Sequence, residues 1–331
     1  QQFIERYITQ FDRWNSPKVL FGESYGTTRS ANLVNYLQNA GITMSGVVLQ
    51  SSILSFALDW EFDPTGIGGG DWTFVLYLPT EAAAAWYHHA AGRGSSLQSF
   101  TAQAQHFAST EYLDALAQGS SLSASSYDDV VAKLHYYTGL SDQYIRNSNL
   151  RIPYWRFESE LLREQGKIVG RLDARFETWA LDRTEDSPDW DPTDAGIDAP
   201  YTTAVNEYLR EDLHYNPPLL YRSSVYDIIA ANGGWSWKHN GTEITNVAVD
   251  LAQALSYNKN LRVFSANGYY DFATPYYATV YTLTHLGIAP AIQSHITLRF
   301  YPSGHMIYLN IPSLAQYHAD LERWYASALS V

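Results

Sequence analysis

Apolar residues along this chain predict alternating strands and helices at its two ends. Near the amino end, apolar positions at helical spacing predict a helix over 1–13. Short apolar runs predict strands over 18–23 and 46–52, with a helix over 25–40 between them. A strand, a helix and a strand in this order predict parallel strands that are joined by a right-handed crossover.

The same alternation returns near the carboxyl end. The expected elements are a helix over 246–257, a strand over 261–266, a helix after Thr274, a strand over 296–300 and a final helix. Thr274 followed by Pro275 is a helix-start signal, so Thr274 is expected to cap the helix. Ser313 and Gln316 have the spacing of a capping box for the last helix.

The middle of the chain has a different pattern. Helices are predicted over 81–91, 96–117 and 126–139. The acidic segment 182–200 is rich in Asp and Pro and is expected to be a long surface loop. We therefore expect an α/β core in residues 1–59 and 236–331, with a mainly helical cap over 60–235 inserted between its two parts.

Composition limits the classes of function. With 331 residues, of which 46% are hydrophobic, the chain can bury a large core. A net charge of −13 argues against binding to nucleic acid or to an anionic membrane surface. No apolar run approaches the length that crosses a membrane. The absence of cysteine excludes disulfides and thiolate metal sites.

The segment Gly22–Gly26 reads Gly-Glu-Ser-Tyr-Gly and lies between a predicted strand and a predicted helix. This arrangement is typical of the nucleophile elbow of an α/β-hydrolase, with Ser24 as the nucleophile. Gly22 and Gly26 are expected where neighbouring backbone passes close by. Because roughly one chain in ten of this length contains the motif by chance, an ordinary turn with an inert serine is the alternative.

A serine nucleophile needs a base, and the base needs a carboxylate to orient it. In α/β-hydrolases these follow in the order Ser, Asp or Glu, His, each after a strand. Asp271 follows the predicted strand 261–266, and His305 follows the strand 296–300. Asp271 could instead cap a helix and His305 could be structural. The order and placement of all three favour a catalytic triad of Ser24, Asp271 and His305.

These motifs resemble the serine carboxypeptidases, and most closely their cysteine-free bacterial members. The segments that carry the resemblance are Gly22–Gly26, Gly268–Asp271, Gly304–Met306, and, in the cap, Tyr77–Thr80 and Gly170–Phe176. The resemblance implies an α/β-hydrolase fold, in which the four visible strands would be the fifth to the eighth. It implies acyl-enzyme chemistry by the triad, an oxyanion donor in the Tyr25 backbone N–H, and no metal or organic cofactor.

The resemblance also gives a role to Glu23. In the family, the matching glutamate helps to bind the free C-terminal carboxylate of a peptide substrate while it shares a proton with a second carboxyl. Since three carboxylates cannot all be ionised in one small site, binding is expected to need that proton. The chain departs from the family at Thr27, where many members have a second glycine.

A larger departure is the absence of the Asn-Gly-Gly-Pro-Gly loop that provides the family's second oxyanion donor. The elbow at residue 24 leaves no room before it for the first strands of the fold. We therefore expect the working protein to include a further amino-terminal segment or chain that completes the sheet. The resemblance implies a secreted or periplasmic location.

Other functions remain open at this point. An acyltransferase, an esterase or an aminopeptidase could use the same triad. The chain could also be a non-catalytic subunit or fragment. Dependence on a free C-terminal carboxylate separates the carboxypeptidase from the other enzymes.

Overall fold

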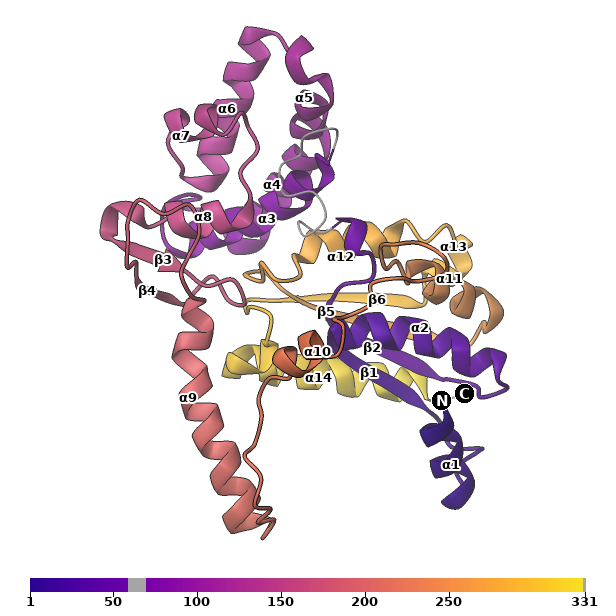
Figure 1. The fold of residues 1–331 in the computed structure, drawn as a ribbon. Coiled ribbons are helices and arrows are strands. Elements are labelled where there is room, and N and C mark those ends of the chain that lie inside the picture. Colours follow the sequence, from indigo (N-terminus) through magenta and orange to yellow (C-terminus); the bar gives the residue numbers. More distant parts are fainter. Residues whose placement is uncertain (59–69, 330–331) are drawn as a thin grey trace.

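The computed structural model describes residues 1–58 and 70–329. The expected boundary between residues 59 and 60 lies outside this part of the chain. The described residues form a mixed α/β protein, in which helices pack around one parallel sheet and a mostly helical block stands beside it (Figure 1). The α/β class that the hydrophobic pattern predicts is confirmed.

The central sheet has four parallel strands in the order β1-β2-β5-β6. They are β1 (Val19–Ser24), β2 (Gly46–Ser52), β5 (Arg262–Gly268) and β6 (Ile296–Tyr301). All four predicted strands are present, with ends within two residues of those expected. In the described sheet β1 is an edge strand that pairs only with β2, and its Phe21 side chain is 51% exposed.

Alternating side chains of the sheet pack against helices on its two faces (Figure 1). Val47 and Leu49 lie in one core with α2 and α11, while Val48 lies in another with α14. Helices of this part are α1 (Gln2–Gln10), α2 (Tyr25–Asn39), α11 (Ala248–Tyr257), α12 (Tyr276–Thr284), α13 (Pro290–Gln293) and α14 (Ile311–Ala328). Strands covered on both faces explain the continuous apolar runs in the sequence.

Both helix caps predicted in this part are wrong. The residue that precedes α12 is Pro275, and the Thr274 hydroxyl donates to Asp271 Oδ2 (2.7 Å) instead of capping a helix. At the start of α14, the Asn310 side chain accepts from the Ser313 N–H (3.0 Å). A capping residue must precede the first helical turn, and Ser313 already lies inside α14.

The cap carries a core of its own, joined by aromatic residues of the α/β part such as Tyr270 and Phe272. Its elements are α3 (Trp72–Tyr87), α4 (Leu97–Phe107), α5 (Leu113–Gln118), α6 (Ala124–Thr138), α7 (Asp142–Asn147), α8 (Tyr154–Glu160), β3 (Lys167–Val169), β4 (Glu177–Trp179), α9 (Pro192–Glu207) and α10 (Tyr226–Ala231). The single helix predicted over 96–117 is divided into α4 and α5 by a π-helical turn at Ala108–Tyr112.

The long loop predicted over 182–200 is wrong in its second half, where α9 begins. The Asp191 side chain accepts from the Thr193 N–H (2.8 Å), and Pro192 occupies the first helical position. Asp at the cap and Pro at the first turn are helix-start signals, although the same residues are common in loops. In Figure 1, α9 extends away from the sheet. Among residues 1–58 and 70–329, none of the helices has the length and apolar character that crossing a bilayer requires.

A buried acid in the cap should make stability depend on pH. Glu81 lies in α3, is 4% exposed, and its Oε1 has no hydrogen-bond partner among the described residues. Burial raises the pKa of Glu81 from 4.5 to about 8. Between these two values only the unfolded chain is ionised, so unfolding releases a proton and stability falls as pH rises.

Replacing Glu81 with glutamine should therefore flatten this pH dependence. The free energy of unfolding of the wild type should be lower at pH 8 than at pH 4.5 by on the order of 4 kcal/mol because of Glu81. The variant should not show this contribution. Urea unfolding at a series of pH values measures the difference. The exposed Glu164→Gln variant is the control and should follow the wild type. Parallel curves for wild type and Glu81→Gln would show that Glu81 is not the group responsible.

Candidate active site

Ser24 occupies a strained turn between β1 and α2. Its φ is 56° and its ψ is −128°, a region that residues other than glycine rarely adopt. A Cβ on Gly22 would lie 2.2 Å from the Gly26 carbonyl oxygen, so only glycine fits there. The same expectation is wrong for Gly26: apart from its chain neighbours and the nearby backbone of its own helix, no described atom lies within 4 Å of its Cβ position. A strained serine between a strand and a helix is what the predicted nucleophile elbow requires.

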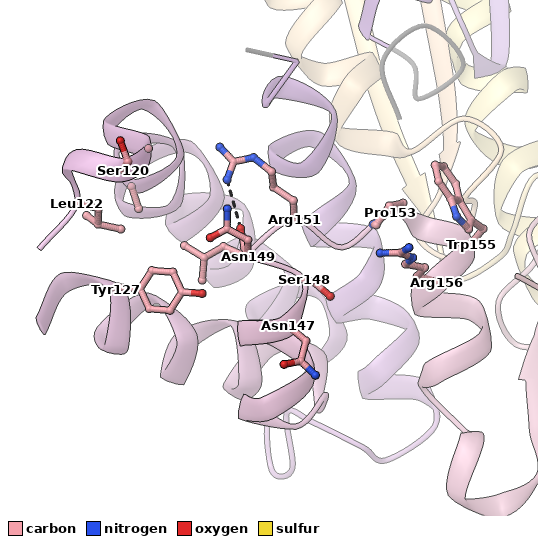
Figure 2. A pocket seen from close by; sticks show the side chains of 13 residues that line it. Ser120, Leu122, Tyr127, Asn147, Ser148, Asn149, Arg151, Pro153, Trp155 and Arg156 are labelled. Atoms are coloured by element: carbon pink, nitrogen blue, oxygen red, sulfur yellow. Dashed lines mark hydrogen bonds between the residues drawn. The ribbon is translucent and has the colours of Figure 1, made fainter. Parts of the chain in front are cut away.

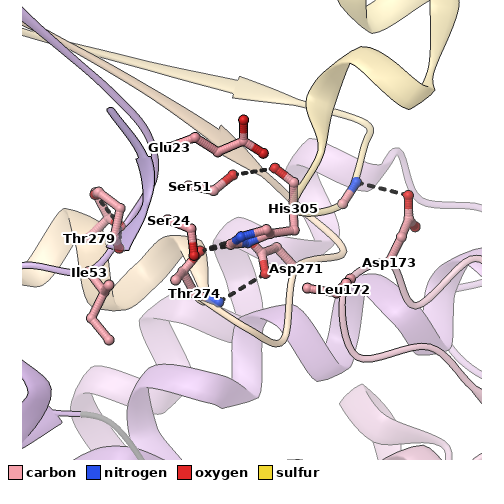
Figure 3. A network of polar contacts seen from close by, with 12 residues as sticks. Glu23, Ser24, Ser51, Ile53, Leu172, Asp173, Asp271, Thr274, Thr279 and His305 are labelled. Carbon is pink, nitrogen blue, oxygen red and sulfur yellow. Dashed lines mark hydrogen bonds and ion pairs between the residues drawn. The ribbon is translucent and has the colours of Figure 1, made fainter. Parts of the chain in front are cut away.

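Sheet topology brings the three predicted residues together. Ser24 ends β1, Asp271 follows β5 by three residues, and His305 follows β6 by four. Since the carboxyl ends of parallel strands meet at one edge of a sheet, residues far apart in sequence converge there. Figure 3 shows Ser24, the imidazole of His305 and the carboxylate of Asp271 beside one another.

Asp271 and His305 form a buried, hydrogen-bonded pair. His305 Nδ1 lies 2.9 Å from Asp271 Oδ2, and Asp271 is 0% exposed. The carboxylate also accepts from the N–H (2.9 Å) and the hydroxyl (2.7 Å) of Thr274. Burial alone would lower the pKa of His305, but the charge and hydrogen bond of Asp271, helped by Glu23, raise it above 6.5. Asp271 therefore stabilises an imidazolium at this position.

This contact also sets which ring nitrogen is free. An Nδ1–H that donates to Asp271 leaves Nε2 without a proton, and Nε2 is the nitrogen that can accept one from Ser24. Among the described residues, the Ser24 hydroxyl makes no hydrogen bond to the ring. In enzymes without substrate this bond is often long, and it tightens in the reacting complex.

The start of α2 places a backbone N–H donor next to Ser24 in the chain. Tyr25 is the first residue of α2, where a backbone N–H has no acceptor within its own helix. The positive end of the helix dipole is also at this amino terminus, where it favours negative charge that develops nearby. The role of the Tyr25 N–H as an oxyanion donor stays a prediction.

Glu23 directly precedes Ser24 and is only partly exposed. Burial raises the pKa of Glu23, while His305 and a hydrogen bond from Tyr308 lower it and Asp271 raises it again, with a net upward shift. The Tyr308 hydroxyl donates to Glu23 Oε1 (3.1 Å). In the described part of the chain, no second carboxyl lies within hydrogen-bond distance of Glu23.

Three contributors to the site are not evident from the sequence. The Ser51 hydroxyl donates to the His305 carbonyl (2.6 Å), Thr274 supports Asp271, and Tyr308 supports Glu23. For Thr274, its position three residues after Asp271 is a usable signal, because side chains so placed can meet across a turn. Ser51 and Tyr308 lie far along the chain from their partners and leave no such signal.

A cleft in the cap is separate from this site. It has a volume of about 810 Å³ and is lined mainly by residues of the α5–α8 region, including Tyr127, Arg151 and Trp155 (Figure 2). None of the three triad residues lines it. Arg151 is already paired with Asp71 through two hydrogen bonds (2.7 and 3.0 Å), so it offers no free charge to a ligand.

Comparisons with known proteins found no matching family model, no matching curated protein and no matching solved structure. Within residues 1–58 and 70–329, no group of three or more His, Asp or Glu side chains is arranged to hold a metal ion.

Proposed function

We propose that this protein is a serine hydrolase with the α/β-hydrolase fold, and specifically a serine carboxypeptidase. The observation that carries the hydrolase proposal is the strained Ser24 beside the buried Asp271–His305 pair. An inert serine gives no reason to keep a residue other than glycine in this backbone conformation, which costs about 1–3 kcal/mol.

The chemistry follows from the positions of the three side chains. His305 Nε2 accepts the Ser24 hydroxyl proton as Oγ attacks the carbonyl carbon of the scissile bond, and the Tyr25 N–H stabilises the oxyanion. His305 then gives the proton to the leaving amine, and an acyl-enzyme remains on Ser24. Water then attacks the carbonyl carbon of the ester while His305 accepts its proton. The acyl group leaves as a carboxylic acid, and His305 returns a proton to the Ser24 oxygen.

Glu23 supports a substrate with a free C-terminus, as the family resemblance implies. A protonated Glu23 can donate to a substrate carboxylate, and the upward shift of its pKa extends the pH range in which it holds that proton. We therefore expect the peptide to bind best at acidic pH, where Glu23 is protonated. An acyltransferase or esterase would keep the triad and would not need Glu23 in this role.

The open edge of β1 supports a further partner. In the described sheet, one side of β1 has no pairing strand and Phe21 is exposed, and both are unfavourable for a strand in an α/β sheet. We propose that a further segment or chain pairs with β1 in the working protein and supplies the second oxyanion donor. A secreted or periplasmic location belongs to the same proposal and rests on the family resemblance.

Matched peptides test the proposed substrate class. A blocked dipeptide with a free C-terminal carboxylate should be cleaved, and the same peptide with a C-terminal amide should be cleaved far more slowly. Equal cleavage of both would overturn the carboxypeptidase proposal while leaving the hydrolase proposal intact. Transfer of the acyl group to an added alcohol in preference to water would identify an acyltransferase.

Binding of the free-acid peptide should weaken as pH rises. Below the raised pKa of Glu23 the carboxyl is protonated and can donate, whereas above it two anions repel one another, so KM should increase. Measuring KM from about pH 4 to 8 tests this, with the amidated peptide as a control. The Glu23→Gln variant stays neutral and should show a flat KM. A flat KM in the wild type contradicts the proposed role of Glu23.

A further inference from the structure

A short segment of the cap lies between the two loops that carry Asp271 and His305. We call residues 171–175 the strap. Three backbone hydrogen bonds join it to the loops: Phe272 N–H to Arg171 O (3.0 Å), Ala174 N–H to Tyr270 O (2.9 Å) and His305 N–H to Leu172 O (2.7 Å). The strap therefore binds the residues on both sides of Asp271 and the backbone of His305 itself.

Asp173 adds a side-chain bond to the same loop. It is 1% exposed, and its carboxylate accepts from the Gly304 N–H (3.1 Å), directly before His305 (Figure 3). The other donors to this carboxylate are the backbone N–H (3.1 Å), Nε (2.9 Å) and Nη2 (2.5 Å) of Arg175. Arg175 also donates to the Pro302 carbonyl (2.9 Å) in the His305 loop. A buried and paired carboxylate is thus used to hold the backbone next to the catalytic base.

Packing leaves this loop no freedom to adjust. A Cβ on Gly304 would lie 2.4 Å from both the Asp173 Cβ and the Leu172 carbonyl oxygen. On the other side, a Cβ on Gly268 would lie 2.2 Å from the Gly304 carbonyl oxygen. The His305 loop is therefore closely packed between the strap and the end of β5, so we expect a change in the strap to displace it.

We propose that Asp173 is a positioning residue for the reaction, and that the strap sets the placement of His305 relative to Asp271 and Ser24. This inference rests on the proposed hydrolase function. It also means that one segment of the cap completes the support of the base. The Ser51 hydroxyl, which binds the His305 carbonyl, supports the loop from the sheet.

The pKa of His305 gives a second measurement, beside kcat, that tests the inference. The groups that act on His305 are Asp271 and Glu23, which raise its pKa, and Arg171, which lowers it. Asp173 and Arg175 lie next to this loop and neutralise one another through their ion pair. Removing the carboxylate leaves a positive charge near His305, and removing the guanidinium leaves a negative one.

The experiment compares Asp173→Asn and Arg175→Gln in the full chain. Both should lower kcat about 10- to 100-fold with little change in KM, because a displaced base slows the chemical step more than binding. Titration of isotopically labelled histidine by NMR should show the pKa of His305 lowered in Asp173→Asn and raised in Arg175→Gln. Asp71→Asn is the control, since it breaks a partly buried aspartate–arginine pair with Arg151 in the cap and should leave kcat and the titration unchanged.

The outcomes separate the two proposals. If the wild type does not react with a fluorophosphonate, the hydrolase proposal fails, and the histidine titration still tests the strap because it needs no activity. If the wild type reacts and both variants keep its kcat and its His305 titration, the positioning role of Asp173 is wrong. If Asp173→Asn does not fold, Arg175→Gln decides, and an unchanged pKa of His305 in that variant overturns the inference.

Discussion

Ser24→Gly should abolish hydrolysis and at the same time stabilise the fold by about 1 kcal/mol. In the proposed mechanism the hydroxyl is the nucleophile, so the rate should fall by on the order of 10⁶. The backbone at φ 56° and ψ −128° strains any residue with a Cβ, at about 1–3 kcal/mol, whereas glycine adopts it freely. The entropy that glycine loses on folding, about 0.5–1 kcal/mol, offsets part of the gain.

Ser24→Ala separates the two effects. Alanine removes the hydroxyl but keeps the Cβ, so this variant should be as inactive as Ser24→Gly and less stable. Urea unfolding of the two variants measures the strain directly as their difference. The same two substitutions at Ser125 in α6 provide the control, and there glycine should be less stable than alanine by up to about 1 kcal/mol. If Ser24→Gly were also less stable than Ser24→Ala, the evidence for backbone strain at residue 24 would be removed.

Asp271→Asn should lower kcat about 10⁴-fold with little change in KM. An asparagine amide can donate to His305 Nδ1, which favours the tautomer with its proton on Nε2, and Nε2 can then no longer accept the Ser24 proton. Loss of the carboxylate charge also lowers the pKa of His305, so that the ring is a weaker base. Steady-state kinetics at several pH values measures both effects.

The chain offers a matched control for this variant. His239 and Asp250 form a second pair of the same type, with Nε2 and Oδ2 2.7 Å apart, and neither contacts the triad. Asp250→Asn should leave kcat unchanged even where it lowers stability. Equal kinetic losses in Asp250→Asn and Asp271→Asn would mean that both act through the fold, and Asp271 would lose its specific role.

The sequence predicted the sheet well because its strands are buried on both faces. Continuous apolar runs such as Gly46–Ser52 cannot be surface segments, and the α/β alternation determines that they run parallel. The same reasoning brought Ser24, Asp271 and His305 to one edge of the sheet. Their mutual placement needs only the order of elements, so the sequence was sufficient for it.

Helix starts were less predictable, because the same side chain can serve either a helix or a tertiary contact. The Thr274 hydroxyl was expected at a helix terminus, and instead it binds Asp271. Asp191 and Pro192 suggested a loop and in fact begin α9. Contacts that join distant parts of the chain, such as Tyr308 to Glu23 and Asp173 to Gly304, follow from packing and leave no local pattern in the sequence.

The central claim is that Ser24 is a nucleophile activated by His305. Its most direct test is to treat the folded full chain with a fluorophosphonate and to locate the adduct by mass spectrometry of its peptides. We predict one adduct per molecule, on Ser24, formed at a rate that increases with pH as His305 loses its proton and that is strongly reduced in His305→Ala. An adduct on another serine, or labelling of Ser24 that is unaffected by His305→Ala, would contradict the claim.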